Sequence, residues 1–140
     1  MTITYKYLIL ESYRHRASTI EFWDNGIIFI KIDDNSETTL EDSKNQYSFL
    51  KSKYNGVNKL KVLVEPGRFS TISKEAREFS TIPKHNEMTV ASAVIVQSLA
   101  HRIVINFIIG FINKQTMKMR MFDNKEKAIE WLLSFDQKNI

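Results

Sequence analysis

The first apolar positions of the chain recur at every second residue, which is the period of a β-strand. They are Ile3, Tyr5, Tyr7 and Ile9, and they alternate with smaller or polar residues. Because successive side chains of a strand point to opposite faces, this alternation predicts a strand near the N-terminus. We place it within residues 1–17, as an addition to a core that spans about residues 18–135.

Two runs rich in strand-forming residues follow, at about Thr19–Trp23 and Ile27–Ile32. Asn25 and Gly26 lie between them. An Asn-Gly pair between two such runs predicts a two-residue hairpin turn of type I′, in which both turn residues have positive φ. We therefore expect an antiparallel hairpin at the edge of a sheet.

After the hairpin, helical and strand patterns alternate to the end of the chain. Predicted helices begin after Thr38 (capping box with Glu41), Ser73, Ser98 and Asp123 (with Glu126 three residues later). Short apolar runs predict strands at residues 60–64, 89–96 and 117–122. Strands that alternate with helices form parallel βαβ units. The order β–β–α–β–α–β–α–β–α therefore predicts one α/β domain over residues 1–140, with a mixed, mostly parallel sheet.

The helix expected over about Leu99–Asn113 is apolar around most of its circumference. A single sheet-facing side accounts for only about a third to a half of such a helix. The surplus apolar positions that we single out are Ile105, Ile108, Ile109 and Ile112. Either neighbouring helices cover them, or they form a homodimer interface or an apolar ligand surface, because apolar patches rarely stay uncovered on a monomer.

Composition narrows the chemistry that the domain can perform. The chain has 140 residues, 43% of them hydrophobic and 26% charged, as in an ordinary globular protein. It contains no Cys, which excludes disulfide scaffolds, zinc ribbons, iron–sulfur sites and thiol catalysis. Its three His leave little for a metal site. We therefore expect no metal and no cofactor.

The net charge of +4 is unevenly distributed, because residues 44–84 carry nine basic and three acidic residues. The basic residues are scattered, and no RNP-like or recognition-helix pattern accompanies them, so we expect no nucleic-acid partner. The apolar run Leu8–Leu10 is too short for a signal peptide, and no segment is long enough to span a membrane. These features predict a cytoplasmic protein without a transmembrane segment.

The loop Glu65–Ser73, EPGRFSTIS, is the best candidate among the loops for a functional role. It follows an interior strand and leads into a helix N-terminus, where α/β folds place ligand contacts. Side chains and free N–H groups there could hold an anion. The candidate residues for a regulatory or anion-binding loop are Arg68, Ser70, Thr71, Ser73 and Lys74. The alternative is a plain connection in which Pro-Gly makes the turn and Ser caps the helix.

No catalytic motif accompanies this loop. HExxH, GxGxxG, P-loop and GxSxG patterns are all absent from the sequence. His101 has no identifiable carboxylate to orient it as a general base. We therefore expect a protein that is not an enzyme.

Three segments resemble STAS-like domains, the anti-sigma-factor-antagonist fold. They are Lys74–Phe79 (KEAREF), Ala93–Asn113 and Met121–Leu132 (MFDNKEKAIEWL). The resemblance covers about residues 18–135 and is to the uncharacterised branch of small bacterial domains. It implies a STAS-like α/β fold, which is related in architecture to the CRAL-TRIO lipid-transfer domains. That second relation would imply an apolar ligand pocket.

In regulatory STAS domains, a Ser at the start of the helix after the third core strand is phosphorylated within an Asp-Ser-Ser-Gly-like motif. The equivalent stretch here is EPGRFSTIS, which lacks that motif. Ser70 or Ser73 would occupy the position. The resemblance therefore predicts a phospho-switch only through one of these two residues.

The leading hypothesis from the sequence is a cytoplasmic protein-interaction or regulatory module that forms a homodimer through part of the apolar helix. The alternative is a carrier of a small apolar or lipid-like ligand. A phospho-switch with a protein partner is a third hypothesis.

Overall fold

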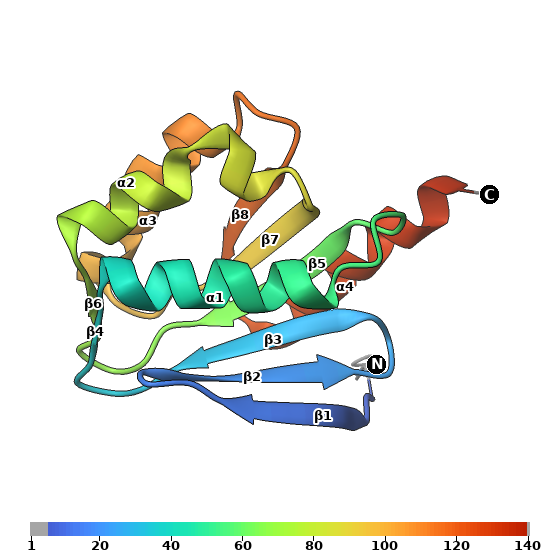
Figure 1. Cartoon of the computed structure of the whole chain (residues 1–140), viewed down its shortest axis with the longest axis horizontal. Helices are drawn as coiled ribbons and strands as arrows, with labels where there is room; N and C mark the ends of the chain where they lie inside the picture. Colours follow the sequence, from blue (N-terminus) through green and yellow to red (C-terminus); the bar gives the residue numbers. More distant parts are fainter. Residues whose placement is uncertain (1–5, 140) are drawn as a thin grey trace.

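The computed structural model describes residues 6–139, which form a central sheet with helices on both of its faces (Figure 1). Within these residues the sheet strands are β1 (Ile9–Arg14), β2 (Ser18–Trp23), β3 (Ile27–Ile32), β5 (Leu60–Glu65), β7 (Thr89–Ile95) and β8 (Lys118–Phe122). They lie in the order β1-β2-β3-β5-β7-β8. β1, β2 and β3 pair antiparallel, whereas β3, β5, β7 and β8 pair parallel. The predicted mixed, mostly parallel α/β fold is confirmed.

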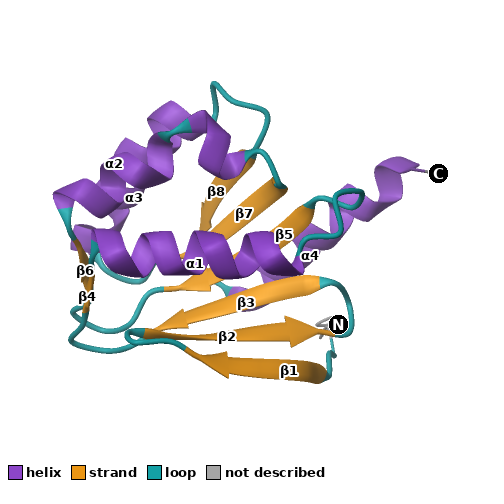
Figure 2. Cartoon of the chain, in the orientation of Figure 1, coloured by secondary structure: helices purple, strands orange, loops and turns teal. Residues whose placement is uncertain are grey.

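The helices divide between the two faces of the sheet (Figure 2). They are α1 (Leu40–Lys53), α2 (Lys74–Thr81), α3 (Leu99–Ile112) and α4 (Lys125–Leu133), with the 3₁₀ helices η1 (Pro83–Asn86) and η2 (Ser134–Asn139). α1, α2 and α3 lie together on one face, and α4 packs on β5, β7 and β8 from the other. We call these the three-helix face and the α4 face.

α1 begins one residue later than the sequence pattern predicts. The expected cap Thr38 belongs to the short strand β4 (Glu37–Thr38), so its backbone is used for strand pairing. Thr39 is the N-cap, with its hydroxyl accepting from the amide of Asp42 while the Asp42 carboxylate accepts from the Thr39 amide. The prediction of a capping box is right in kind and wrong by one position.

The caps of the later helices follow the same side-chain rule. Ser73 and Ser98 cap α2 and α3, as predicted, by accepting hydrogen bonds from the third residue of each helix. α4 begins after Asn124, not after Asp123, and the Asn124 side chain accepts from the Lys127 amide. Short polar side chains thus fix where each of these helices starts.

The β2–β3 hairpin forms where predicted, but its turn is not of type I′. Gly26 has φ +87°, whereas Asn25 does not share its positive φ. The amide of Gly26 donates to the carbonyl of Trp23, and Phe22 pairs with Ile28. Residues 24–26 therefore form a three-residue loop that ends in a left-handed glycine. The two-residue prediction is wrong because strand register, which the Asn-Gly pair does not specify, sets the loop length.

The N-terminal strand is only partly comparable with its prediction. Ile3 and Tyr5 lie outside the described residues. Tyr7 stacks on Trp23 with ring centroids 3.6 Å apart, and β1 starts at Ile9. β1 then pairs antiparallel with β2, and so extends the hairpin into a three-stranded edge.

A two-stranded parallel sheet joins two loops and is missing from the sequence-based description. β4 pairs with β6 (Thr71–Ile72) beside the ends of β3 and β5. The loop before β6 crosses so close to the end of β3 that a Cβ on Gly67 would lie 2.2 Å from the Asp33 carbonyl oxygen. Only glycine allows this crossing, which holds the start of α1 near the start of α2.

Alternating strand residues supply two separate hydrophobic layers. On the α4 face they form one continuous cluster of buried residues, Trp23, Ile27, Phe29, Leu63, Ala91, Ala93, Ile95, Ala128, Ile129 and Leu132. On the three-helix face they form two clusters. One contains Ile20, Ile28, Ile30, Leu50, Val62 and Met88, and the other contains Ile108, Ile112 and Met117. The three-helix face is thus packed in two parts.

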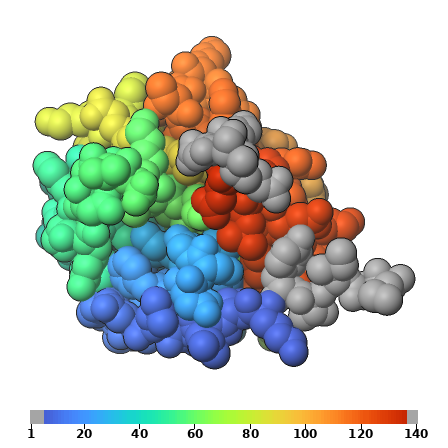
Figure 3. All heavy atoms as spheres, turned by 90° about the vertical axis from the view of Figure 1, so that its right-hand side faces the viewer, coloured from blue at the N-terminus to red at the C-terminus, as the bar shows by residue number. Residues whose placement is uncertain are grey.

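The end of α4 and η2 are tied to the α4 face by an ion pair. The Lys61 ammonium, which is almost buried on β5, donates to both carboxylate oxygens of Asp136 at 2.6 and 2.7 Å. In the space-filling view, the red C-terminal segment lies beside the light-blue β2–β3 hairpin (Figure 3). This ion pair holds η2 against β5.

Candidate functional site

A cavity of about 440 Å³ lies on the three-helix face, between the helices and the sheet. The apolar side chains of its wall come from the sheet and from α3: Ile30, Ile32, Val64, Val94, Val104, Ile105, Ile108 and Met119. The volume falls within the range of about 300–1,000 Å³ that is usual for small-molecule sites. The cavity includes residues of both clusters of the three-helix face, so it occupies the place where a continuous core would otherwise run.

Polar side chains of α1 and α2 form the opposite wall of this cavity. They are Asp42, Ser43, Asn45 and Gln46 from α1, and Arg77 and Ser80 from α2. A smaller hollow of about 180 Å³ shares Ser43, Gln46 and Ser80 in its lining and reaches toward Met88 and Met117. The arrangement, a mainly apolar pocket with a few polar groups on one side, is typical of sites that orient a small ligand.

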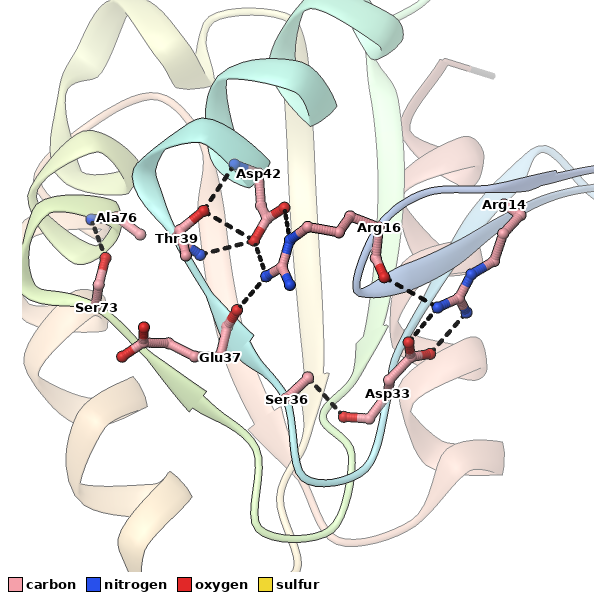
Figure 4. Close-up of polar contacts among 9 residues, drawn as sticks. All are labelled: Arg14, Arg16, Asp33, Ser36, Glu37, Thr39, Asp42, Ser73 and Ala76. Carbon is pink, nitrogen blue, oxygen red and sulfur yellow. Dashed lines mark hydrogen bonds and ion pairs between the residues drawn. The ribbon is translucent and has the colours of Figure 1, made fainter.

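The first charged group of the lining, Arg16, is neutralised by Asp42. Its Nε donates to Asp42 Oδ1 at 2.8 Å, and one terminal nitrogen contacts Oδ2 at 2.5 Å and the Glu37 carbonyl at 2.6 Å (Figure 4). The Arg16 hydrogen bonds, followed by those from Thr39, lower the pKa of Asp42 to about 2. This pair joins the β1–β2 connection to the start of α1 and leaves no free charge at that end of the cavity.

The second charged group, Arg77, has no such partner. Its Nε is buried and makes no hydrogen bond, and its guanidinium makes no ion pair with any residue between 6 and 139. Arg77 and Ser80 are three residues apart on α2 and so lie on the same side of the helix, which is the side that lines the cavity. Arg77 is therefore an uncompensated cation in the cavity wall.

His101 and Ser70 meet at the end of the cavity near the start of α3. The His101 Nε2 lies 2.9 Å from the Ser70 carbonyl oxygen and 3.4 Å from its Oγ. A carbonyl can only accept, so Nε2 carries the proton and donates to it. The same nitrogen cannot then accept the Ser70 hydroxyl proton, and this contact is not that of a nucleophile with its general base.

The structure divides the five residues of the predicted Glu65–Ser73 site. Ser70 is 7% exposed and lines the cavity, as does Thr71, whereas Arg68 and Lys74 are exposed and lie outside the cavity lining. The Ser73 hydroxyl accepts from the Ala76 amide as the cap of α2 (Figure 4). Phosphorylation of Ser70 or Ser73 stays a prediction, on hydroxyls that are buried or engaged in this conformation.

Four amides of this loop already donate within the protein, and anion binding by the loop stays a prediction. The amides of Ser70, Thr71 and Ser73 donate to carbonyl oxygens of residues 67, 36 and 38, and the Arg68 amide donates to the Asp34 carboxylate at 2.7 Å. The β4–β6 pairing takes up two of these four donors, the amides of Thr71 and Ser73. Because that pairing joins segments more than thirty residues apart, the local sequence gives no sign of it.

The four isoleucines singled out on α3 do not share one surface. Ile108 and Ile112 are 4% and 1% exposed and form part of the core, while Ile105 and Ile109 are half-buried. Ile105 and Ile108 line the cavity. The apolar side chains that α3 leaves open are others, which we call the outer α3 stripe: Leu99, Ile103, Phe107 and Phe111, between 73% and 47% exposed.

Arg77 is the residue of the site that the sequence-based reasoning missed. In the sequence it is one of the scattered basic residues between positions 44 and 84. The available signal was its place on a short helix next to Ala76 and two residues from Phe79, which puts a charge close to the buried side.

None of the helices formed by residues 6–139 has the length and apolar character needed to cross a bilayer. Over the same range, no group of three acidic or His side chains could hold a metal ion.

Comparisons with known proteins agree with the architecture. A family model described as "Domain of unknown function (DUF7793)" matches residues 21–136. An uncharacterised protein of the DUF3478 family from Shewanella loihica PV-4, whose solved structure has a SpoIIAA-like fold, is similar with a TM-score of 0.56 and 17% identity, covering 94% of this chain and 99% of that one. No curated protein matches the chain. The STAS-like fold is thus confirmed, since SpoIIAA-like describes the same architecture, and the CRAL-TRIO relation stays a prediction.

Proposed function

The chain belongs to the family described as a domain of unknown function, DUF7793, and from its cavity we infer that the protein binds a small, largely apolar ligand on the three-helix face. The single observation that carries this proposal is the cavity itself, about 440 Å³ with an apolar wall from the sheet and α3. Protein interiors are normally close-packed, so an apolar hollow of this size costs contact energy that a ligand would restore.

This proposal reverses the order of the hypotheses that the sequence favours. The sequence ranks an interaction module first, because α3 has more apolar residues than a sheet face requires. In the structure, part of that surplus, Ile105 and Ile108, lines the cavity. A ligand in the cavity would therefore account for these residues without a second protein.

Native mass spectrometry of the protein purified from its host cells tests the proposal. We expect a bound small molecule on the unaltered protein and its loss from Ile105→Trp, whose larger ring would occupy the cavity. Ile103→Trp is the matched control, because it makes the same change on the same helix at a residue that is 62% exposed and outside the cavity lining. An empty wild-type protein, or equal occupancy in both variants, would contradict the proposal.

A second candidate function, self-association, is favoured by the outer α3 stripe. Its four side chains recur at every fourth residue and so form one continuous apolar ridge, on which Phe107 and Phe111 pack edge to face. Light scattering in the micromolar range should then give the mass of a dimer for the wild-type protein and of a monomer for Phe107→Glu. A wild-type monomer would remove this candidate and leave the ligand proposal untouched.

A further inference from the structure

Arg77 supplies the cavity with a positive charge that the protein does not neutralise. We propose that Arg77 binds the carboxylate head of the ligand, which makes the ligand a monoanionic amphiphile such as a medium-chain fatty acid. This inference rests on the proposed function of the cavity and names the class of molecule that fits it.

The charges around the cavity indicate how many negative charges the ligand has. Arg16 and Asp42 form a pair through two hydrogen bonds, so they cancel each other. Glu75 and Glu78, the acidic residues of α2, are exposed and make no ion pair with Arg77. Two histidines also line the cavity: His101 donates to the Ser70 carbonyl, and the His15 ring packs edge-on against Phe49. The Arg77 guanidinium is therefore the charged group of the lining that has no counter-charge, and a ligand with one negative charge would neutralise it.

The chemistry of the guanidinium indicates which anion it prefers. Its planar fork matches a carboxylate through two parallel hydrogen bonds, and such charge-assisted pairs are stronger in a partly buried site than in water. A phosphate monoester carries a charge of about −1.5 to −2 at neutral pH, so part of it would enter the cavity without a counter-charge. A carboxylate is therefore the better match for this single cation.

The rest of the lining indicates what is attached to the carboxylate. Polar groups of α1 and α2, such as Gln46 and Ser80, lie on the same wall as Arg77, whereas Val94, Ile105 and other apolar side chains form the sheet and α3 side. A molecule with its head at α2 and a hydrocarbon tail along the sheet would satisfy both walls. A short, fully polar acid would leave the apolar wall without contacts.

Titration calorimetry with two ligands of equal chain length tests the role of the head group. The probes are decanoate and 1-decanol, and the proteins are wild type, Arg77→Gln, Arg77→Lys and Arg102→Gln. Arg102 is the matched control, because it is an exposed arginine of α3 outside this cavity lining. Circular dichroism establishes that each variant is folded, and Arg77→Lys keeps the charge while losing the bidentate fork.

We expect decanoate to bind wild type and Arg102→Gln alike, and to bind Arg77→Gln about tenfold to a hundredfold more weakly, as for the loss of a hydrogen bond to a charged group. Arg77→Lys should lie between them. Decanol should bind more weakly than decanoate to wild type and equally to wild type and Arg77→Gln. This pattern would support the assignment of Arg77 as the head-group site.

Two results would overturn the inference and are distinguishable from failure of the proposed function. Equal binding of decanoate to wild type and Arg77→Gln would show a ligand cavity without a head-group site at Arg77. The absence of binding of either probe, with a bound molecule still present in protein from cells, would exclude this ligand class but not the cavity's role. The absence of both would remove the proposed function and the inference together.

Discussion

The two faces of the sheet are formed by the same strands but are packed differently. On the α4 face, the buried residues form one continuous cluster, in which Leu63, Ile129 and Leu132 are at most 1% exposed. On the three-helix face, the buried residues form two clusters, and a cavity of about 440 Å³ takes the place between them. One face is thus a continuous core, and the other contains the hollow in which we propose that a ligand binds.

The residues of β7 show how the two faces diverge. Toward α4, β7 presents Ala91 and Ala93, which lie in one cluster with Ala128 of α4, so small side chains let the helix approach closely. Toward the other face it presents Ser92 and Val94, and Val94 lines the cavity. On that face, α2 packs on both α1 and α3, and the three helices together form an arch over the sheet. The hollow follows from this arch.

The largest expected effect is a difference between equal truncations on the two faces. Ile129→Ala removes a 1% exposed side chain from the continuous cluster of the α4 face and should lower the free energy of unfolding by about 4 kcal/mol. Ile108→Ala removes a 4% exposed side chain that already borders the cavity, so it loses fewer contacts and should cost about 2 kcal/mol. Urea unfolding followed by circular dichroism measures both.

These two variants are matched in residue type, in burial and in their position on a helix that covers the sheet. Equal losses of stability would mean that the three-helix face is packed as tightly as the α4 face in solution. The contrast between a structural face and a binding face would then be lost.

A smaller effect, an increase in stability instead of a loss, is expected when Arg77 is replaced. Arg77→Met replaces an unpartnered guanidinium with an apolar side chain of similar length, so the ligand-free protein should become more stable by about 1 kcal/mol. Thermal unfolding of the ligand-free protein should show a higher Tm than wild type. A lower Tm would indicate that Arg77 has a structural role, because replacing a residue that serves binding at the expense of stability raises the Tm.

The smallest effect concerns the rim of the cavity and depends on pH. The Arg16 guanidinium holds the pKa of Asp42 at about 2, below its ordinary value of 3.8. The stabilisation by this pair is therefore present above pH 3.8 and is lost as the pH falls through 2. Arg16→Gln should lower stability at neutral pH only slightly, because the Arg16 side chain is largely exposed and solvent screens its pair with Asp42.

Urea unfolding of wild type and Arg16→Gln across the acid range measures this effect. The difference between the two proteins should be constant near neutral pH and should shrink as Asp42 becomes protonated. A difference that does not depend on pH would show that Arg16 acts through packing and not through its ion pair with Asp42.

Much of the fold follows from local patterns that are visible in the sequence. Ser73 and Ser98 cap helices at the predicted positions, and the hairpin and the parallel strands form where the apolar runs predict them. The cap of α1 and the hairpin turn differ from prediction, because strand pairing at Glu37–Thr38 and the register of β2 with β3 override the local signals. Local rules thus identify elements, and pairing sets their ends.

The candidate site was predictable only in part. An apolar surplus on α3 was visible from composition, and Ile105 and Ile108 do line the cavity. The sequence does not show which way the other apolar side chains of α3 point, because a helix that is apolar on most sides does not reveal which side meets the sheet. The helical position of Arg77 near Ala76 places it close to the buried side of α2, but its lack of an ion-pair partner depends on elements distant in the chain.

The sequence by itself determined the order of the main-sheet strands and the α-helices, the parallel sheet with its hairpin edge, and the lack of Cys-based chemistry. These properties follow from hydrophobic period, capping residues and composition, all of which act over a few residues. Only the tertiary structure decided that α1, α2 and α3 lie together over one face of the sheet, that Ser70 lines the cavity while loop amides donate to distant carbonyl oxygens, and that Arg77 is left without a partner. A cavity and an uncompensated charge depend on how distant segments meet, and no local pattern records that.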